Sequence, residues 1–242
     1  MQLIIKHKLP RELVLPIHYH HILQSIIYHN LREDYGYSDF LHEKGYASEE
    51  RQYRMFVFGL LQGRYEIVQK NIVFRNEVSF RVRSADNRML RLLKENLERR
   101  GINYLQQHYE DLELELTDDD IREEKVRVRM ASPLCVYSTA PETKKTYFYH
   151  PQEPEFAEQV NANFRRKYKA YTGLEPKSDI QIRPLRLRDK DKYVTKYKGF
   201  YISGWLGEYE LSGEAKYLDF LYQTGLGSKN AQGFGLFDVV EE

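Results

Sequence analysis

The stretch Gly225-Leu226-Gly227-Ser228-Lys229-Asn230-Ala231-Gln232-Gly233-Phe234-Gly235 is the most specific local feature of this sequence. Two Gly-x-Gly pairs enclose five mostly polar residues. Glycine reaches positive φ without steric cost and lets another backbone approach closely. Successive main-chain N–H groups in such a turn form an anion-binding nest, and Lys229 adds a positive charge. The stretch therefore predicts either a loop that binds an extended phosphate backbone or a flexible hairpin.

Two familiar phosphate-binding loops do not fit this stretch. A Walker A loop needs Gly-Lys-Ser/Thr after its spacer, and that sequence is absent. A dinucleotide-binding loop needs G-x-G-x-x-G between a strand and a helix. Here Asn230 stands where the third glycine belongs, and the expected order is helix, loop, strand.

The elements around the loop predict the order β-α-β-β-α-β in the second half of the chain. Val126 and Val128 alternate with Arg127 and Arg129, as in a half-buried strand over 125–130. A short strand is expected at 146–150, and a helix over 153–171 with Gly173 as its stop. The remaining elements are expected at 180–187 and 199–207 (strands), 213–223 (helix) and 234–240 (strand).

The first half predicts a similar order. A strand over 1–9 precedes a helix that opens at Pro16 and runs to about residue 31. Strands at 53–61 and 72–83 follow. Asp86 is the expected N-cap of a helix that ends at Arg100 with Gly101 as its C-cap. A strand over 109–116 closes the series.

Two such series indicate an α+β fold with two tandem ferredoxin-like (β-α-β-β-α-β) domains. The acidic segment 117–124 is the expected linker, so the domains are predicted at 1–118 and 125–242. The halves share element order without a clear sequence repeat. A single α+β domain remains the alternative.

Composition excludes several classes of protein. The 242 residues are 41% hydrophobic and 30% charged, and no apolar run approaches the roughly 20 residues that span a bilayer. Lys6, Lys8 and Arg11 interrupt the apolar stretch that a signal peptide needs. The single cysteine, Cys135, excludes an internal disulfide framework and indicates a reduced, intracellular setting.

Positive charge is concentrated in one stretch, although the net charge is only +1. Residues 165–198 hold twelve Lys and Arg against four acids, a local +8, whereas residues 199–242 have a local −5. The stretch is either a solvated charged surface or a surface for nucleic-acid phosphates. Phosphate contacts are predicted for Arg183, Arg186, Arg188, Lys190 and Lys192, and at the end of the preceding helix for Arg165, Arg166, Lys167 and Lys169.

Three parts of the sequence together resemble the CRISPR-associated endoribonucleases of the RAMP superfamily, which cut precursor CRISPR RNA within its repeats. One is the G-x-G-x5-G-x-G pattern at 225–235 with its trailing apolar strand. Another is Leu15-Pro16 leading into a helix that ends Ile26-Ile27-Tyr28. The third is Phe40-Leu41-His42-Glu43. In element order, the resemblance covers nearly the whole chain.

The resemblance implies two ferredoxin-like folds, no metal or other cofactor, and cleavage by the RNA's own 2′-hydroxyl. Such cleavage gives a 2′,3′-cyclic phosphate and a 5′-hydroxyl. The implied partner is CRISPR repeat RNA, with other subunits of a CRISPR effector complex and a homodimer as further possibilities. The implied setting is the prokaryotic cytoplasm, with no membrane. The implied backbone clamp on RNA is formed by Gly225, Gly227, Lys229, Gly233 and Gly235.

The implied catalytic residues are His42, Tyr28 and Lys44. Histidine, with an ordinary pKa of about 6.5, serves as general acid or base. Helical geometry places Tyr28 nearly opposite the apolar face, with His21 and Gln24, so it is not an obvious core residue. The position expected for the family's lysine reads Ser48. Lys44 is therefore favoured for the positive group, with Arg51 and Arg54 as alternatives.

Competing interpretations stay open for these residues and for the whole chain. Without the resemblance, His42 and Tyr28 can each be read as a surface residue with no catalytic role. His18, His20 and His21 form the one tempting metal cluster. A helix brings His18 and His21 together, but a metal site also needs a third ligand and usually a nearby acid. A non-catalytic RAMP subunit that binds CRISPR RNA shares the fold and the loop. A more distant alternative is a ferredoxin-like metabolic enzyme or small-molecule regulator.

Overall fold

The computed structural model describes residues 1–32, 45–48, 51–197 and 199–240. Its helices are α1 (His20–Leu31), α3 (Asn87–Arg100), α4 (Pro154–Thr172) and α5 (Ala215–Thr224), with 3-10 turns η2 (Asp189–Asp191) and η3 (Asn230–Gln232). In the part of the chain that the structure describes, no helix combines the length and the apolar character needed to cross a membrane.

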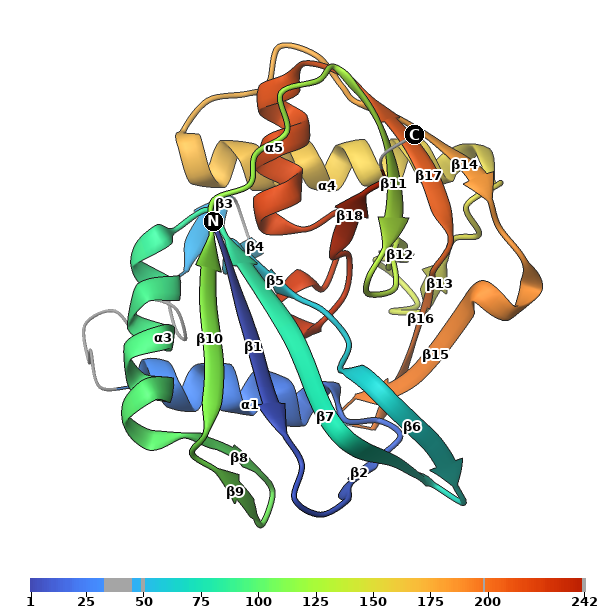
Figure 1. Cartoon of the computed structure of the whole chain (residues 1–242). Helices are drawn as coiled ribbons and strands as arrows, with labels where there is room; N and C mark the ends of the chain where they lie inside the picture. The colour runs from blue at the N-terminus through green and yellow to red at the C-terminus, as the bar shows by residue number, and fades with distance from the viewer. Residues whose placement is uncertain (33–44, 49–50, 198, 241–242) are drawn as a thin grey trace.

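The first sheet is built from residues 2–117 and is antiparallel throughout. Its strands run in the order β10-β1-β7-β2, and β5 and β6 also pair with β7. Their bounds are β1 (Gln2–Lys8), β2 (Leu13–Pro16), β5 (Phe56–Phe58), β6 (Gln62–Val68), β7 (Asn71–Ser84) and β10 (Leu112–Thr117). Helices α1 and α3 cover one face of this sheet (Figure 1).

The second sheet repeats that arrangement between residues 125 and 239. Its order is β14-β17-β11-β18. The last strand along the chain, β18, therefore lies beside the first, β11, and β17 lies between β11 and β14. In the first sheet, the last strand, β10, likewise lies beside the first, β1, and β7 lies on the other side of β1. Both sheets therefore have the ferredoxin-like topology that the sequence predicts. The strands are β11 (Lys125–Met130), β14 (Gln181–Arg186), β17 (Glu208–Ser212) and β18 (Phe237–Val239).

Within the described residues, four strand pairs lie outside these sheets. Three are short: β3 (Tyr46–Ser48) with β4 (Arg51–Tyr53), β8 (Ile102–Tyr104) with β9 (Gln107–Tyr109), and β12 (Tyr137–Thr139) with β13 (Thr146–Phe148). The fourth is the hairpin of β15 (Lys192–Tyr197) and β16 (Phe200–Trp205). It reaches from the second sheet toward α1 (Figure 1).

Local signals explain most helix ends. Asp86 accepts a hydrogen bond from the Arg88 amide at 3.0 Å, and Gly101 ends α3 at a φ of 67°. Gly173 ends α4 in the left-handed region at a φ of 75°. These three predictions are confirmed. On α1, the predicted apolar face is also confirmed, because every one of its members is buried: Ile22, Leu23, Ile26, Ile27 and Leu31.

Two predictions of element position are wrong. Pro16 does not open a helix; it ends β2, opposite Asn71 of β7, and α1 begins at His20. Proline is tolerated there because it lies at the end of a strand. The strand predicted at 199–207 does not belong to the second sheet, since it forms the outer hairpin as β16. The third strand of that sheet is β17, which the sequence analysis missed.

The two halves are joined by buried side-chain contacts as well as by the chain. Arg81 of β7 makes a two-pronged ion pair with Asp238 of β18, at 2.6 Å for each contact. The neighbouring Arg83, only 1% exposed, donates to Asp238, to Gln2 and to the Phe237 carbonyl. An arginine with this many oriented acceptors fixes β18 firmly against the first sheet.

Candidate active site and nucleic-acid interface

The glycine-rich loop at 225–235 lies between the two halves and is largely buried. It follows α5 and leads into β18, which confirms the predicted order of helix, loop and strand. Its main chain is tied to the second half on both sides: the Ser228 amide donates to the Cys135 carbonyl at 2.8 Å, and the Gly235 amide donates to the Pro133 carbonyl at 2.9 Å. These bonds oppose the alternative of a flexible hairpin.

Glycine is required in this loop by packing as well as by backbone angle. Gly225, Gly227, Gly233 and Gly235 all have φ between 68° and 87°. A Cβ on Gly235 would lie 2.0 Å from the Leu226 carbonyl oxygen, and one on Gly233 would lie 2.6 Å from the Phe58 ring. The four glycines therefore let neighbouring chain segments touch each other.

Asn230 and Lys167 hold the loop in shape from inside. The Asn230 amide nitrogen donates to the Leu226 and Phe234 carbonyls at 3.2 and 3.0 Å. Lys167 of α4 donates from Nζ to the Gly225 carbonyl and to Asn230 Oδ1. Lys167 is 1% exposed, and burial lowers its pKa to about 7. The prediction that Lys167 belongs to an exposed basic helix end is wrong, since its ammonium faces the loop.

Side chains of α1 attach the loop to the first half. His20 donates from Nδ1 to the Gln232 carbonyl at 2.9 Å and accepts at Nε2 from the Tyr193 hydroxyl at 3.0 Å. Gln24 donates to the Ala231 carbonyl at 2.6 Å. Burial lowers the pKa of His20 to about 4, so that its ring is neutral at pH 7. The loop is thus a joint between α1 and α4.

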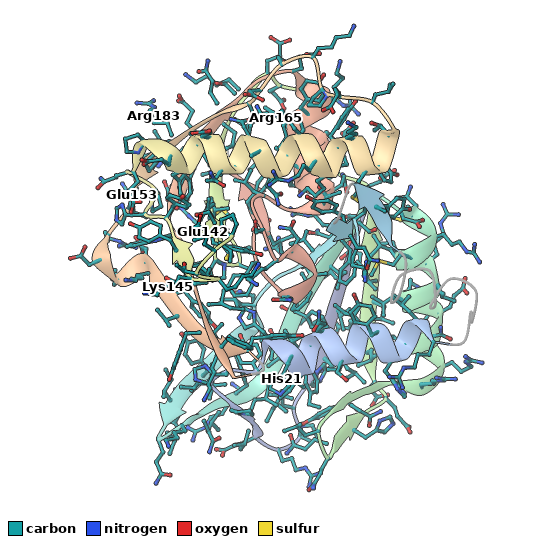
Figure 2. The ribbon with its side chains drawn as sticks, turned by 180° about the vertical axis from the view of Figure 1, so that it is seen from behind. His21, Glu142, Lys145, Glu153, Arg165 and Arg183 are labelled. Atoms are coloured by element: carbon teal, nitrogen blue, oxygen red, sulfur yellow. The ribbon has the colours of Figure 1, made fainter. Side chains whose placement is uncertain are left out.

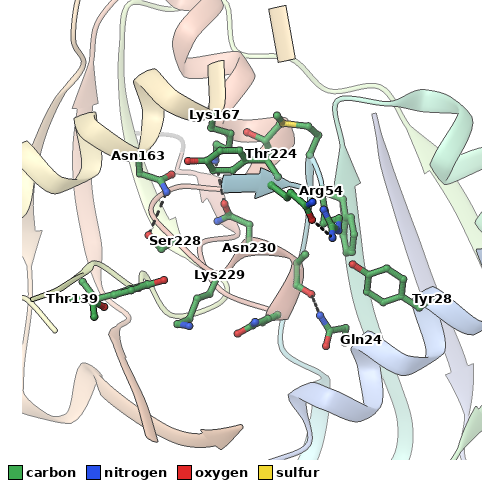
Figure 3. Close-up of a pocket in the computed structure, with 17 residues that line it drawn as sticks. Gln24, Tyr28, Arg54, Thr139, Asn163, Lys167, Thr224, Ser228, Lys229 and Asn230 are labelled. Carbon is green, nitrogen blue, oxygen red and sulfur yellow. Dashed lines mark hydrogen bonds between the residues drawn. The ribbon is translucent and has the colours of Figure 1, made fainter. Parts of the chain in front are cut away.

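A cavity of about 530 Å³ opens beside this joint (Figure 3). The first half contributes side chains of α1 and of the segment 52–56, and the second half contributes α4, β12 and the loop. A volume of this size lies within the range of roughly 300–1,000 Å³ that is usual for small-ligand sites. Its polar lining includes Gln24, Tyr28, Arg54, Asn163, Lys167, Ser228, Lys229 and Asn230.

Tyr28 lies on the α1 side of this cavity (Figure 3). Its ring packs edge-on against Phe56, with centroids 5.9 Å apart, and the side chain is half-buried. Burial raises the pKa of the Tyr28 phenol, and the charge and hydrogen bond of Arg54 oppose that shift in part. Tyr28 therefore keeps its proton at neutral pH and is suited to donate one. Helical geometry predicted that Tyr28 points away from the apolar face, whereas its side chain packs partly against the core of the first half.

His42 and Lys44 lie outside the described residues, as do Phe40, Leu41 and Glu43. Of the two alternatives named for the positive group, Arg54 lines the cavity with Tyr28. It donates to Gln52 Oε1 at 3.2 Å. The structure thus brings Tyr28, Arg54 and the glycine-rich loop around one space.

Much of the predicted phosphate-binding stretch is engaged in ion pairs. Arg183 on β14 pairs with Glu210 at 3.0 Å, and Arg188 pairs with Asp191 at 3.1 Å. Arg165 pairs with Asp179 at 2.6 Å. Such pairs on an exposed surface contribute little to stability, but they reduce the local positive charge. Arg186, Lys190 and Lys192 are exposed.

The histidine cluster at the start of α1 is divided among separate partners. His18 accepts at Nδ1 from the Lys196 amide at 3.2 Å and contacts the Thr195 hydroxyl, whereas His21 contacts the His18 carbonyl. Within the described ranges, no three His, Cys, Asp or Glu side chains group closely enough to hold a metal ion. Two of the three histidines thus serve to attach the hairpin and the loop to α1.

Two features of this region carry no clear signal in the sequence. One is the pair of Lys167 and Asn230, which are 63 residues apart. The other is Gln24, which links the loop to the hairpin because the Tyr197 hydroxyl donates to its Oε1. A lysine within an apolar stripe of a helix is a weak signal of burial. No sequence signal marks a contact between residues 173 positions apart.

Comparisons with known proteins agree with this geometry. A family model described as "CRISPR associated protein Cas6, C-terminal" matches residues 115–239, more than half of the chain. A protein of Methanocaldococcus jannaschii, named "CRISPR-associated endoribonuclease Cas6 1", is 24% identical over 252 residues, which cover 95% of this chain and 89% of that protein.

Solved structures resemble the whole chain in fold. A structure described as "Characterization of a Cas6-related gene from Pyrococcus furiosus" matches with a TM-score of 0.85 and 19% identity, covering 100% of this chain and 99% of that one. Another, described as "An RAMP protein binding different RNA substrates", matches with a TM-score of 0.83 and 20% identity over 100% of both chains.

Proposed function

Because the chain belongs to the Cas6 family of CRISPR-associated RAMP proteins, we propose that it is a metal-independent endoribonuclease that cuts precursor CRISPR RNA within its repeats. The observation that carries the proposal is the cavity, which Tyr28, Arg54 and the glycine-rich loop line together. A curated relative that is named an endoribonuclease supports it. In this proposal residues 1–118 are the domain with the catalytic groups, and residues 125–242 bind the RNA backbone.

The proposed reaction is a transesterification within the RNA. The 2′-oxygen attacks the adjacent phosphorus, and the bond from phosphorus to the 5′-oxygen breaks. The proton of the 2′-hydroxyl passes to a general base, and a general acid gives a proton to the leaving 5′-oxygen. The products are a 2′,3′-cyclic phosphate and a 5′-hydroxyl.

We assign the base to His42 and the proton donor to Tyr28. Tyr28 fits the second role by its place in the cavity wall, where its phenol carries a proton at neutral pH. Positive charge near the phosphate stabilises the transition state. Arg54 fits that role by its place in the cavity wall, in addition to Lys44. Lys229 of the loop, which lines the cavity, contacts the RNA backbone, while Gly225, Gly227, Gly233 and Gly235 shape the loop that carries it. The exposed Arg186, Lys190 and Lys192 add phosphate contacts.

The test is cleavage of a cognate repeat RNA in the presence of EDTA. We expect cutting to persist with the chelator, to yield a cyclic phosphate, and to stop when the cleaved nucleotide carries a 2′-deoxy substitution. His42→Ala and Tyr28→Phe should each reduce the single-turnover rate by about 10²–10⁴-fold. His29→Ala and Tyr65→Phe, both at exposed positions, are the matched controls.

Each negative result has a distinct meaning. Loss of cutting in EDTA, or an undiminished rate for His42→Ala, would contradict the mechanism. Tight binding of repeat RNA without cleavage under any condition would instead identify a non-catalytic RNA-binding subunit. An RNA affinity that does not fall with rising salt would exclude phosphate contacts and favour a small-molecule role.

A further inference from the structure

The hairpin of β15 and β16 is a separate arm attached to α1. On the side that faces α1, the Tyr193 hydroxyl bonds to His20, Thr195 contacts His18 at 3.1 Å, and the Tyr197 hydroxyl bonds to Gln24. Figure 2 shows this arm reaching the end of α1 that carries His21. Successive contacts therefore lead along α1 toward Tyr28, which lies one helical turn beyond Gln24.

Phe200 lies on the same face of the hairpin as those tyrosines. It is the direct cross-strand partner of Tyr197, and side chains of directly opposed residues in an antiparallel pair project to one face, about 5 Å apart. Other residues of that face are buried: Thr195 is 1% exposed and Ile202 is 3% exposed. Phe200 is 77% exposed, the largest fraction among the large apolar side chains of the described residues.

Phe200 is linked to the cavity wall through Tyr197 and Gln24. Its partner Tyr197 bonds to Gln24, which lines the cavity together with Tyr28. Tyr197 packs against the cluster of Cys135, Ile202 and Phe234 as well. A fixed arm thus presents an exposed aromatic ring at the α1 side of the cavity.

The surroundings of Phe200 are positively charged and aromatic. Residues 192–205 contain three lysines and no acidic residue, and five aromatic residues. On the outer face, Lys196 lies 5.8 Å from the ring centroid of Tyr201, which is 66% exposed. Exposed rings among lysines suit unpaired nucleotides, because bases stack on the rings and phosphates pair with the ammonium groups. A protein partner with an apolar surface would not need the lysines.

We propose that Phe200 is a substrate-positioning residue on which one unpaired base of the RNA stacks, beside the phosphate held in the Tyr28 cavity. This rests on the proposed RNA endonuclease function. The stacked base fixes the register of the strand, so that the scissile phosphate meets Tyr28 and not its neighbour. Any base can stack, and the contact therefore positions the strand without reading its sequence.

The test measures RNA affinity, using repeat RNA with a 2′-deoxy substitution at the cleaved nucleotide. Phe200→Ala should weaken binding by about 5- to 150-fold, as expected for the loss of one stacked base. Phe200→Trp should restore it. Leu174→Ala is the matched control, because Leu174 is 67% exposed at the far end of α4 and carries no proposed contact.

Abasic substitutions locate the base. Each unpaired nucleotide around the cut is replaced in turn, and each RNA is measured with the wild type and with Phe200→Ala. At one position, the abasic substitution should lower the RNA affinity of the wild type as much as Phe200→Ala does. The same substitution should not lower the affinity of the Phe200→Ala variant any further. Equal affinities for Phe200→Ala and Leu174→Ala would overturn the proposal.

Two further outcomes separate this proposal from its rivals. A wild type that sediments as a dimer, with Phe200→Ala monomeric and unchanged in RNA affinity, would show that the ring is an interface with a second copy. RNA that binds with the Phe200 effect but is never cut would leave the stacking role standing and would overturn the nuclease function alone.

Discussion

The glycine-rich loop and the β15–β16 hairpin are both candidate RNA contacts, yet they are built in opposite ways. The loop is conspicuous in the sequence, and its carbonyls at Gly225, Ala231 and Gln232 accept hydrogen bonds that join it to α4 and α1. The hairpin has no motif, and Phe200 beside its turn is 77% exposed. A conspicuous motif can therefore reflect a demand of packing, while an inconspicuous segment carries the freer binding surface.

Replacing one glycine in the loop and one in the hairpin should give the largest difference in the free energy of unfolding between the two regions. Gly235→Ala places a Cβ 2.0 Å from the Leu226 carbonyl at a φ of 87°, so the backbone must shift. We expect a loss of about 4 kcal/mol in the free energy of unfolding, from strain and overpacking together. Gly199→Ala in the hairpin has a similar φ of 90° but meets no atom of the described residues within 4 Å.

Gly199→Ala should accordingly cost only the backbone strain, roughly 1–2 kcal/mol. Urea unfolding followed by circular dichroism measures both variants. Equal losses for the two alanine variants would show that the loop is no more constrained than the hairpin.

Acid should weaken the joint between loop and hairpin through His20. Burial lowers the pKa of His20 from 6.5 to about 4, so the unfolded chain binds a proton before the folded protein does. Stability is therefore full above pH 6.5 and is lost as pH falls from 6.5 to about 4. The loss attributable to this group is about 3 kcal/mol.

Comparison of the wild type with His20→Gln isolates that effect, because other titrating groups cancel in the difference. The free energy of unfolding of the wild type should fall more steeply with acid than that of the variant. His29→Gln on the exposed face of α1 serves as the control. Parallel curves for wild type and His20→Gln would refute the role of His20.

Removal of the internal support of the loop should have an intermediate effect. Asn230→Ala deletes two donors to loop carbonyls and one acceptor for Lys167. Buried groups left without partners should cost about 2 kcal/mol in unfolding free energy. Thr139→Ala, which lines the same cavity but bonds only to the exposed Thr146, should stay within about 0.5 kcal/mol of the wild type. Thermal melts of both variants provide the measurement.

The smallest expected effect concerns salt. Lys192→Gln at the base of the hairpin should lower the slope of log affinity for RNA against log salt by about 1, as for one lost phosphate contact. Arg183→Gln should change it less, because Glu210 already pairs with that guanidinium at 3.0 Å. Titrations between about 50 and 300 mM KCl measure these slopes. If β14 binds the RNA backbone instead, Arg183→Gln should change the slope more than Lys192→Gln does.

Local signals in the sequence predicted the elements well, and tertiary contacts account for the failures. The caps at Asp86, Gly101 and Gly173 were predicted correctly because each acts within its own turn of chain. Strand β17 was missed because it adjoins β16, and only pairing with β11 and β14 distinguishes them. Pro16 was misplaced because pairing with β7 competes with helix initiation.

For the site residues too, local signals were readable in the sequence and tertiary contacts were not. The apolar stripe of α1 predicted the buried face correctly, but Tyr28, expected opposite that face, packs against the first core as well as lining the cavity. Lys167 was misread, since its sequence neighbours are charged and its burial depends on partners in a loop 58 residues away. Gln24 and Phe200 gave no signal, because their importance depends on how the hairpin lies against α1.

The ion pairs of Arg81 and Arg83 with Asp238 bear on how the chain matures during synthesis. Strand β18, which carries Asp238, lies more than 150 residues after β7. A nascent chain that has emerged only as far as α5 has most of both sheets but lacks β18, the glycine-rich loop and one wall of the cavity. Contacts of such long sequence separation form late. The cavity can therefore be completed only after translation has passed Asp238.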